Sequence, residues 1–274
     1  MKFSVLLSVY IKENPEYLKE SLESITTNQT MMPNEIIIVK DGQLNDDLDK
    51  VLMHYERRYP KVVKCIGYKN NRGLGFALNL GLKHCSNELI FRMDTDDIAV
   101  SDRFVKQLNF YKLRPNLALI GGYLEEFENK SLKSIGLKKC PLEKSSIKSK
   151  LKVSNPFNHP TVMFRKSIIQ SLGGYSVEFL GFEDYELWAR LIKSGYETAN
   201  IPDVLVKFRV TNDQLYRRKG INYMKKEFKL IKQLYSLRVI SGIEAIKKLI
   251  ISLLIRLLPN SLFKIAIKIY RRQI

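Results

Sequence analysis

Short, continuous apolar runs recur through the first hundred residues, and stretches with helical spacing separate them. Runs at 3–10, 35–40 and 62–67 are too short for helices and predict strands that are buried on both faces. Helices are expected between them, at about 16–27 and 47–59. Because continuous apolar runs are typical of parallel strands, the pattern predicts an α/β protein with a mostly parallel central sheet and helices on both faces.

A fourth apolar run, from 89 to 93, leads directly into three carboxylates, Asp94, Asp96 and Asp97. In open α/β sheets, ligands gather at the carboxyl ends of strands. Carboxylates this close repel one another, which favours a bound cation, and oxygen-only ligands suit Mg²⁺ or Mn²⁺. The alternative is an acidic loop that caps a following helix.

Beyond residue 97 the pattern is weaker. A helix is expected at 103–113 and strands at 117–122, 161–164 and 204–210, whereas 126–152 is lysine-rich and weakly patterned. Glu183 and Asp184 stand where a helix should begin, ahead of an apolar stripe that includes Trp188. Acidic residues are favoured at that end of a helix.

Basic residues are concentrated in the last part of the chain. The formal net charge is +18, and the 58 residues after 216 carry +13 of it, with 15 Lys and Arg against Glu227 and Glu244. A basic tail favours a polyanionic partner. No motif for base stacking or groove binding is visible, so an anionic membrane surface is preferred to nucleic acid.

Two tail helices are expected, at 244–258 and 261–272, with Pro259 between them. In the second, Lys264, Lys268, Arg271 and Arg272 share one face, a pattern typical of a helix lying in a membrane interface. The alternative is a helix pair packed on the domain with solvated lysines. The apolar run at 249–255 is far short of the roughly 20 residues that a spanning helix needs.

Common cofactor and targeting signals are not found. The loop at 70–75 lacks the third glycine of a dinucleotide fingerprint, since position 78 is Leu, and no P-loop motif is present. Three scattered cysteines form no CxxC pair, and the first apolar run is too short for a signal peptide. These features favour a cytoplasmic protein.

Five segments together resemble the family 2 glycosyltransferases of the GT-A fold. They are Ser8-Val9-Tyr10, Ile38-Val39-Lys40-Asp41-Gly42, Asn71-Arg72-Gly73-Leu74-Gly75, Arg92-Met93-Asp94-Thr95-Asp96-Asp97 and Gly181-Phe182-Glu183-Asp184-Tyr185-Glu186-Leu187-Trp188. The resemblance covers roughly residues 1–210. A narrower similarity, at 216–220, Glu227 and the basic tail, is to bacterial enzymes that extend lipid-linked oligosaccharides for surface polysaccharides such as O-antigen or exopolysaccharide.

The resemblance implies a GT-A-like catalytic domain at 1–215 and a basic amphipathic helical tail at 216–274. The nucleotide-sugar half would span about 1–100 and the acceptor half about 101–215. It implies an inverting hexosyltransferase that moves a sugar, such as galactose, from a UDP-sugar to a lipid-linked saccharide, with Mn²⁺ or Mg²⁺ as cofactor. Such an enzyme would be peripheral on the inner face of the cell membrane.

Roles follow from the resemblance for individual residues. Tyr10 and Asp41 would hold the nucleotide, Asp94 would contact the nucleotide sugar, Asp96 would coordinate the metal with Asp94 and Asp97, and Asp184, paired with Glu183, would be the general base. Asn71, Gly73 and Arg92 lie in the same motifs and are expected to help bind the donor.

One position departs from the family pattern. Members often carry a metal-binding His after the last strand, whereas this chain has Thr211 there, so Asp97 and water would have to complete the shell. His159, beside Pro160, could contact substrate or be a structural loop residue. The competing function is a metal-dependent nucleotidyltransferase or another nucleotide-binding protein. A nucleotidyltransferase should carry a basic, glycine-rich loop after the first strand, and residues 8–14 contain no glycine.

Overall fold

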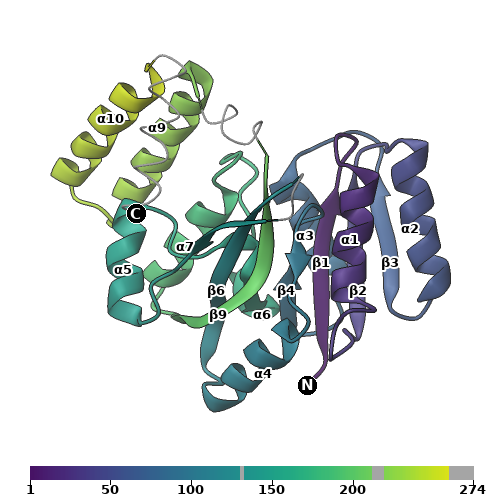
Figure 1. Cartoon of the computed structure of the whole chain (residues 1–274). Coiled ribbons are helices and arrows are strands. Elements are labelled where there is room, and N and C mark those ends of the chain that lie inside the picture. The colour runs from purple at the N-terminus through teal and green to yellow at the C-terminus, as the bar shows by residue number, and fades with distance from the viewer. Residues whose placement is uncertain (130–132, 212–218, 259–274) are drawn as a thin grey trace.

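A computed structural model of the chain describes residues 1–129, 133–211 and 219–258. Within them, a nine-stranded sheet has the order β3-β2-β1-β4-β8-β6-β9-β5, and β7 pairs with β6. Helices cover both faces of the sheet, and two further helices extend from one side (Figure 1). The predicted α/β class, with a C-terminal helical extension, is confirmed.

The first half of the sheet is parallel. Its strands are β1 (Phe3–Val9), β2 (Glu35–Asp41), β3 (Val63–Tyr68) and β4 (Leu89–Arg92), and the helices between them are α1 (Pro15–Ile25), α2 (Asp46–Arg58) and α3 (Leu74–His84). Successive side chains of a strand point to opposite faces. Val5 therefore joins the cluster with α1 and α2, whereas Leu6 joins the cluster with α3.

The second half adds short antiparallel pairings to the mostly parallel sheet. Its strands are β5 (Ile98–Ala99), β6 (Leu117–Glu128), β7 (Ser134–Lys138), β8 (Met163–Arg165) and β9 (Glu197–Val210). β8 lies antiparallel between β4 and β6, β5 pairs antiparallel with β9 and β7 with β6, and β9 runs parallel to β6. The antiparallel β8 joins the two halves into one continuous sheet.

The helices of the second half are α4 (Arg103–Leu113), α5 (Lys144–Val153), α6 (Lys166–Ser171) and α7 (Glu183–Lys193), with one 3₁₀ turn (His159–Thr161). α7 is almost entirely buried and carries Trp188 into the cluster that also holds α3. Glu183 and Asp184, the two acids predicted to supply the catalytic base, therefore lie in the first turn of a core helix.

The weakly patterned segment 126–152 contains the end of β6, all of β7 and most of α5. Every residue of β7 is exposed, and α5 buries only Ile147 and Leu151. An exposed edge strand and a helix with two core contacts leave little periodicity in the sequence, which explains why neither was predicted.

Two helices form the described part of the tail, α9 (Ile221–Ser236) and α10 (Gly242–Arg256). They pack side by side, and α10 is the outermost helix of the molecule (Figure 1). Within the described residues, no helix is both long and apolar enough to cross a bilayer. The second predicted tail helix, at 261–272, lies outside the described residues, and the division at about residue 215 stays a prediction.

Candidate active site

Three of the predicted site residues lie where neighbouring parallel strands end. Tyr10 follows β1 directly, Asp41 is the last residue of β2, and Asp94 lies two residues beyond β4. Because β2, β1 and β4 are adjacent and parallel, these residues lie along one edge of the sheet. This is the edge where α/β sheets bind ligands.

Asp41 is almost fully buried and fixes the loop before α3. Its carboxylate accepts hydrogen bonds from Tyr68 Oη at 2.8 Å, Asn71 Nδ2 at 3.0 Å, Arg72 N at 2.7 Å and Gly73 N at 3.0 Å. Four donors occupy the lone-pair positions of one carboxylate. In this state Asp41 therefore shapes the loop that carries Asn71 and Gly73.

A cleft of about 830 Å³ adjoins this loop at the carboxyl ends of β2 and β3. Its lining includes Ile11, Gly42, Leu44 and Tyr68. Gly42 has φ +89°, and a Cβ there would lie 2.7 Å from the backbone nitrogen of Asn71. Only glycine therefore lets the turn after β2 pass this close to the loop.

The three carboxylates after β4 form one cluster. Asp94, Asp96 and Asp97 each offer an oxygen, and these oxygens all lie within 4.8 Å of one another. Burial and the charge of Asp94 raise the pKa of Asp96 to about 6. Burial and repulsion from Asp96 and Asp94 raise the pKa of Asp97 well above its usual range.

The cluster fits a hard divalent cation. Asp97 Oδ1 accepts the backbone N–H of Arg209 at 2.9 Å, but its buried Oδ2 has no hydrogen-bond partner among the described residues. A buried carboxylate oxygen without a donor, next to two further carboxylates, is stabilised by a cation. The predicted metal residues are therefore brought together.

The end of β9 packs against the cluster, just before Thr211, the position where the family pattern often has His. Arg209 is buried, and its Nε donates to the carbonyl oxygen of Asp96 at 2.9 Å. Its guanidinium also pairs with Glu20 and donates to Asn129 at 2.8 Å. In this chain, Arg209 holds the backbone of the metal loop in place.

Arg92 lies beneath the site as the last residue of β4. Its side chain is 2% exposed and pairs with Asp94. Its Nε and Nη1 are buried and have no hydrogen-bond partner among the described residues. Burial raises the pKa of Asp184, and the charge of the Arg92 guanidinium acts in the opposite direction and lowers it. The predicted base is therefore within electrostatic range of the strand that leads to the acidic cluster.

The two acids at the start of α7 have different surroundings. Glu183 is 6% exposed, and its Oε2 accepts the backbone N–H of Gly181 at 2.8 Å. Asp184 is partly exposed and accepts from Asn155 Nδ2 at 2.6 Å and from Tyr185 N at 2.7 Å. Asp184 therefore stays partly open to solvent, while Glu183 fixes the turn before the helix.

Tyr175 and His159 are hydrogen-bonded to each other, within electrostatic range of Arg92. The charges of Arg92, Asp184 and Asp94 all act on the Tyr175 hydroxyl, which hydrogen-bonds His159 Nε2 at 3.1 Å. Burial and Arg92 lower the pKa of His159 well below its usual range, so the imidazole is neutral. Both rings pack around Trp188, whose indole lies in the core.

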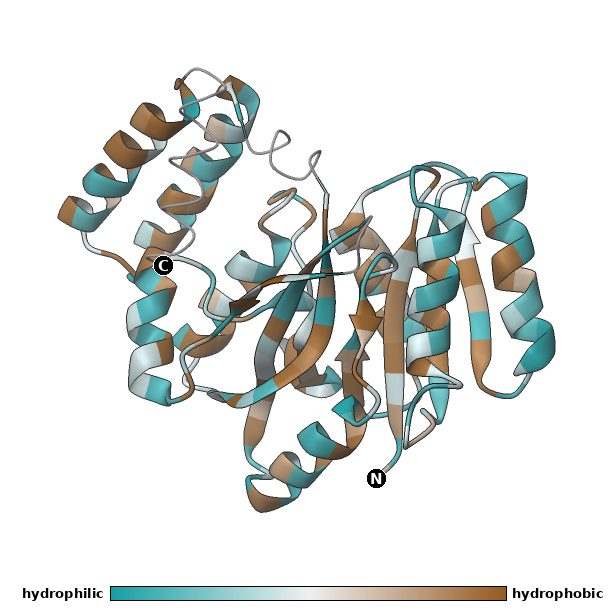
Figure 2. Cartoon of the chain, in the orientation of Figure 1, coloured by the Kyte–Doolittle hydropathy of each residue, from teal (hydrophilic) through white to brown (hydrophobic). Residues whose placement is uncertain are grey.

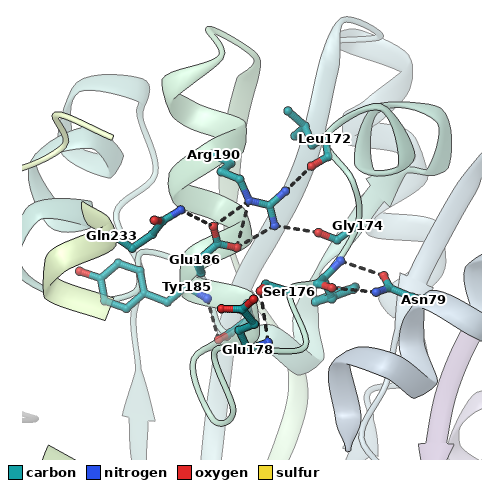
Figure 3. A network of polar contacts seen from close by, with 11 residues as sticks. Asn79, Leu172, Gly174, Ser176, Glu178, Tyr185, Glu186, Arg190 and Gln233 are labelled. Atoms are coloured by element: carbon teal, nitrogen blue, oxygen red, sulfur yellow. Dashed lines mark hydrogen bonds and ion pairs between the residues drawn. The ribbon is translucent and has the colours of Figure 1, made fainter. Parts of the chain in front are cut away.

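A polar network holds the loop that carries Tyr175 (Figure 3). Asn79 of α3 accepts from Tyr175 N at 2.8 Å and donates to Tyr175 O at 2.7 Å. Arg190 donates to the carbonyl oxygens of Leu172 and of Gly174, the latter at 2.7 Å, and pairs with Glu186 at 2.7 Å. Helices α3 and α7 therefore fix this loop from two sides.

Several site residues were not found from sequence. Three of them form hydrogen bonds with predicted site residues that lie 27 to 112 residues away along the chain: Asn155, Tyr68 and Arg209. The fourth, Tyr175, interacts with the charge of Arg92. Of these residues, only Arg209 could have been found from the sequence, because it lies in the segment 208–211, which ends at the position where family members often have His.

The amino-acid sequence matches known proteins over most of its length. Residues 4–173 match the family model described as glycosyl transferase family 2. A curated relative from Escherichia coli, named UDP-Gal:alpha-D-GlcNAc-diphosphoundecaprenol beta-1,3-galactosyltransferase, is 40% identical over 261 residues, covering 95% of this chain and 93% of the relative. The amylovoran biosynthesis glycosyltransferase AmsE of Erwinia amylovora is 38% identical, covering 94% of each chain.

The fold is also found among solved structures. A mannosyltransferase from Pyrobaculum calidifontis, determined in complex with GDP-Man and Mn²⁺, superimposes with a TM-score of 0.64 at 16% identity. The match covers 88% of this chain and 65% of that longer chain. At this identity the likeness shows a shared GT-A-like fold.

Proposed function

This chain belongs to glycosyl transferase family 2 and is a glycosyltransferase of polysaccharide synthesis, and on that premise we propose a specific reaction for it. The reaction is transfer of a hexose, galactose being the first candidate, from a UDP-sugar to a lipid-diphosphate-linked saccharide. It proceeds with inversion at the anomeric carbon. The donor and acceptor are taken from the galactosyltransferase relative, which aligns over 95% of the chain.

The nucleotide half would hold the donor. The uridine would occupy the cleft beside Tyr10 and Asp41, and the Asp41 carboxylate would exchange one of its loop donors for a base or ribose group. Asn71 and Gly73 lie on the loop that Asp41 fixes, and Arg92 has donors left over beside Asp94. A cationic group at that point stabilises negative charge on a diphosphate.

Asp96, with Asp94 and Asp97, would hold Mn²⁺ or Mg²⁺. A divalent ion supplies charge stabilisation to a leaving diphosphate. The ion would also relieve the mutual repulsion that raises the pKa values of Asp96 and Asp97.

Asp184 would accept the proton of the acceptor hydroxyl as its oxygen attacks the anomeric carbon. One base on the face opposite the leaving group suffices for an inverting displacement. Asn155 and the backbone N–H of Tyr185 hold the carboxylate and favour its ionised form. His159 and Tyr175 would line the acceptor side next to it.

One observation carries the proposal. The acidic cluster and Asp184 come from opposite halves of the chain, yet both act electrostatically on Arg92 or on Tyr175. A nucleotide-binding protein without transfer chemistry has no need of a carboxylate held by two hydrogen bonds on the acceptor side. We further place the enzyme on the cytoplasmic face of the membrane, where a lipid-linked acceptor would be presented.

A panel of UDP-Gal, UDP-Glc, UDP-GlcNAc and GDP-Man, each with a GlcNAc-diphosphate-lipid acceptor, tests the proposal. Transfer is expected from UDP-Gal, with Mn²⁺ and not with EDTA, and the product should carry a β-linked sugar. Transfer from GDP-Man alone, or nucleotide-sugar synthesis in place of transfer, would refute it.

A further inference from the structure

Helix α10 turns its apolar side to solvent. Six Ile and Leu side chains, spaced three and four residues apart, fall on one face and are all exposed. They are Ile243, Ile246, Ile250, Leu253, Leu254 and Leu257, here called the α10 face. Ile243 is 68% and Leu254 64% exposed. Brown, hydrophobic residues recur along this outermost helix (Figure 2).

The opposite side of α10 faces the protein and is mixed, because Ala245 and Leu249 pack against the core while three polar side chains form hydrogen bonds. Ser252 Oγ donates to Glu227 of α9 at 2.5 Å, and Arg256 Nε donates to the same carboxylate at 3.2 Å. Lys248 Nζ donates to the carbonyl oxygen of Val153 at 2.7 Å. A helix on a water-exposed surface normally has the reverse arrangement. A contiguous exposed apolar face of this kind marks an interaction site.

We infer that the α10 face inserts into the interface of an anionic membrane, with α10 lying parallel to the surface. This rests on the proposed function, in which the acceptor is lipid-linked. With 15 residues, α10 is too short to span a bilayer but long enough to lie in its interface.

The positive charge of this part of the chain favours an anionic lipid surface over a second protein surface as the partner of the α10 face. Lys247 is exposed on α10 itself, Lys225 and Lys232 are exposed on α9, the helix that packs beside α10, and the segment after residue 216 carries +13. Polybasic segments beside an apolar insertion are attracted to anionic headgroups. The same charge opposes self-association of two α10 faces.

The docking would also set the position of the base. Gln233 of α9 donates to Glu186 of α7 at 3.1 Å, two residues after Asp184 (Figure 3). Leu230, Ile231 and Leu234 of α9 join the same core cluster as Trp188. A membrane bound to α10 would therefore be fixed relative to α7, and Asp184 would meet sugars attached to a diphosphate at the headgroup level.

Co-sedimentation of the full-length protein with vesicles tests the inference. The vesicles contain either equal parts of phosphatidylethanolamine and phosphatidylglycerol, or phosphatidylcholine alone. The wild-type chain should bind the anionic vesicles, and the double variant Ile246→Gln/Leu254→Gln should bind about tenfold or more weakly. The matched control Met53→Gln/Leu113→Gln changes two exposed apolar residues elsewhere and should bind as the wild type does.

Lys225→Gln/Lys247→Gln should weaken binding at low salt but not at about 1 M salt, where the screening length falls to about 3 Å. UDP binding should stay unchanged in every variant, because none of these residues lies in the donor site. Unchanged sedimentation of the α10 variant would overturn the inference. So would a wild-type dimer that the α10 substitutions dissociate without loss of vesicle binding. Vesicle binding without sugar transfer would instead refute the proposed function.

Discussion

Asn155 donates a hydrogen bond of 2.6 Å to Oδ2 of Asp184, from a loop 29 residues earlier in the chain. The bond leaves Asp184 oriented by two donors, the Asn155 amide and the Tyr185 backbone N–H, while its neighbour Glu183 is bound to the backbone of its own turn. On this difference we propose separate roles for the two adjacent acids.

The first prediction separates these roles. Asp184→Asn should keep the affinity for the donor but lower transfer by about 10² to 10⁴, the range for a lost general base. Glu183→Gln should keep far more turnover and mainly lower stability, since it touches Gly181 and not the open side of the site. Single-turnover rates and UDP-sugar titrations measure both effects. An active Asp184→Asn enzyme together with a dead Glu183→Gln enzyme would move the base to Glu183.

The second prediction concerns pH. Burial raises the pKa of Asp184, and the base acts only when ionised, so kcat/KM should fall as the pH drops through that raised pKa. The Asn155 hydrogen bond stabilises the ionised form and lowers the pKa, hence Asn155→Ala should move the acidic limb to higher pH. Asn155→Asp adds a negative charge and should move it further. A limb that stays in place in both variants would show that another group controls the profile.

The strands that carry the site could be predicted from the sequence, because they are continuous apolar runs that end in acids. β1, β2, β4 and α4 lie within about one residue of the predicted bounds or match them. The acidic cluster could also be predicted, because its three members are close in sequence and therefore also lie close together in space. Local pattern was sufficient where the contacts are local.

The contacts that complete the site could not be predicted, because they are tertiary. Nothing near Asn155 in the sequence indicates that it meets Asp184, and nothing near Tyr68 indicates that it meets Asp41. The orientation of α10 was also missed. Its Lys248 and Arg256 bond inward to Val153 and Glu227, which the sequence pattern did not indicate. Which face of an amphipathic helix is buried depends on the surface that it packs against, and the periodicity of the helix does not identify that surface.

The third prediction tests the metal residues. Asp96→Ala should abolish transfer and weaken UDP binding only when Mn²⁺ or Mg²⁺ is present, because the lost contact is through the ion. Asp102→Ala is a matched control, since Asp102 pairs with Lys106 on the surface and lies outside the cluster. Calorimetric titration of UDP, with metal and with EDTA, measures the difference. Equal UDP affinity in both buffers for the wild-type enzyme would exclude a role for metal in nucleotide binding.

The fourth prediction concerns the Asp41 hub. Tyr68→Phe removes one donor at 2.8 Å and should cost about 1.5–3 kcal/mol of stability, because the acceptor is charged. Asp41→Ala removes the three side-chain bonds to the loop at 71–73 as well as the bond from Tyr68, and should weaken UDP binding much more strongly than Tyr68→Phe does. Thermal unfolding and UDP titration of the two variants give the comparison. Full UDP affinity in Asp41→Ala would show that the loop does not contribute to the donor site.

The last prediction concerns the ion pair that fixes the Tyr175 loop. Glu186 is 2% exposed at its side chain, and Arg190 pairs with it while donating to the carbonyl oxygens of Leu172 and Gly174. Arg190→Met keeps the bulk but leaves a buried carboxylate without its cation, so the free energy of unfolding should fall by about 3–5 kcal/mol. Gln233 would remain the other donor to Glu186.

The double variant Arg190→Met/Glu186→Met removes both charges and should recover much of that loss, because no unpaired buried charge remains. Neither variant touches the donor cleft, so UDP affinity should hold, while the KM for the acceptor should rise as Tyr175 loses its support. Denaturant unfolding and acceptor kinetics test both statements. If the double variant is no more stable than Arg190→Met, the carbonyl contacts and not the ion pair hold this loop.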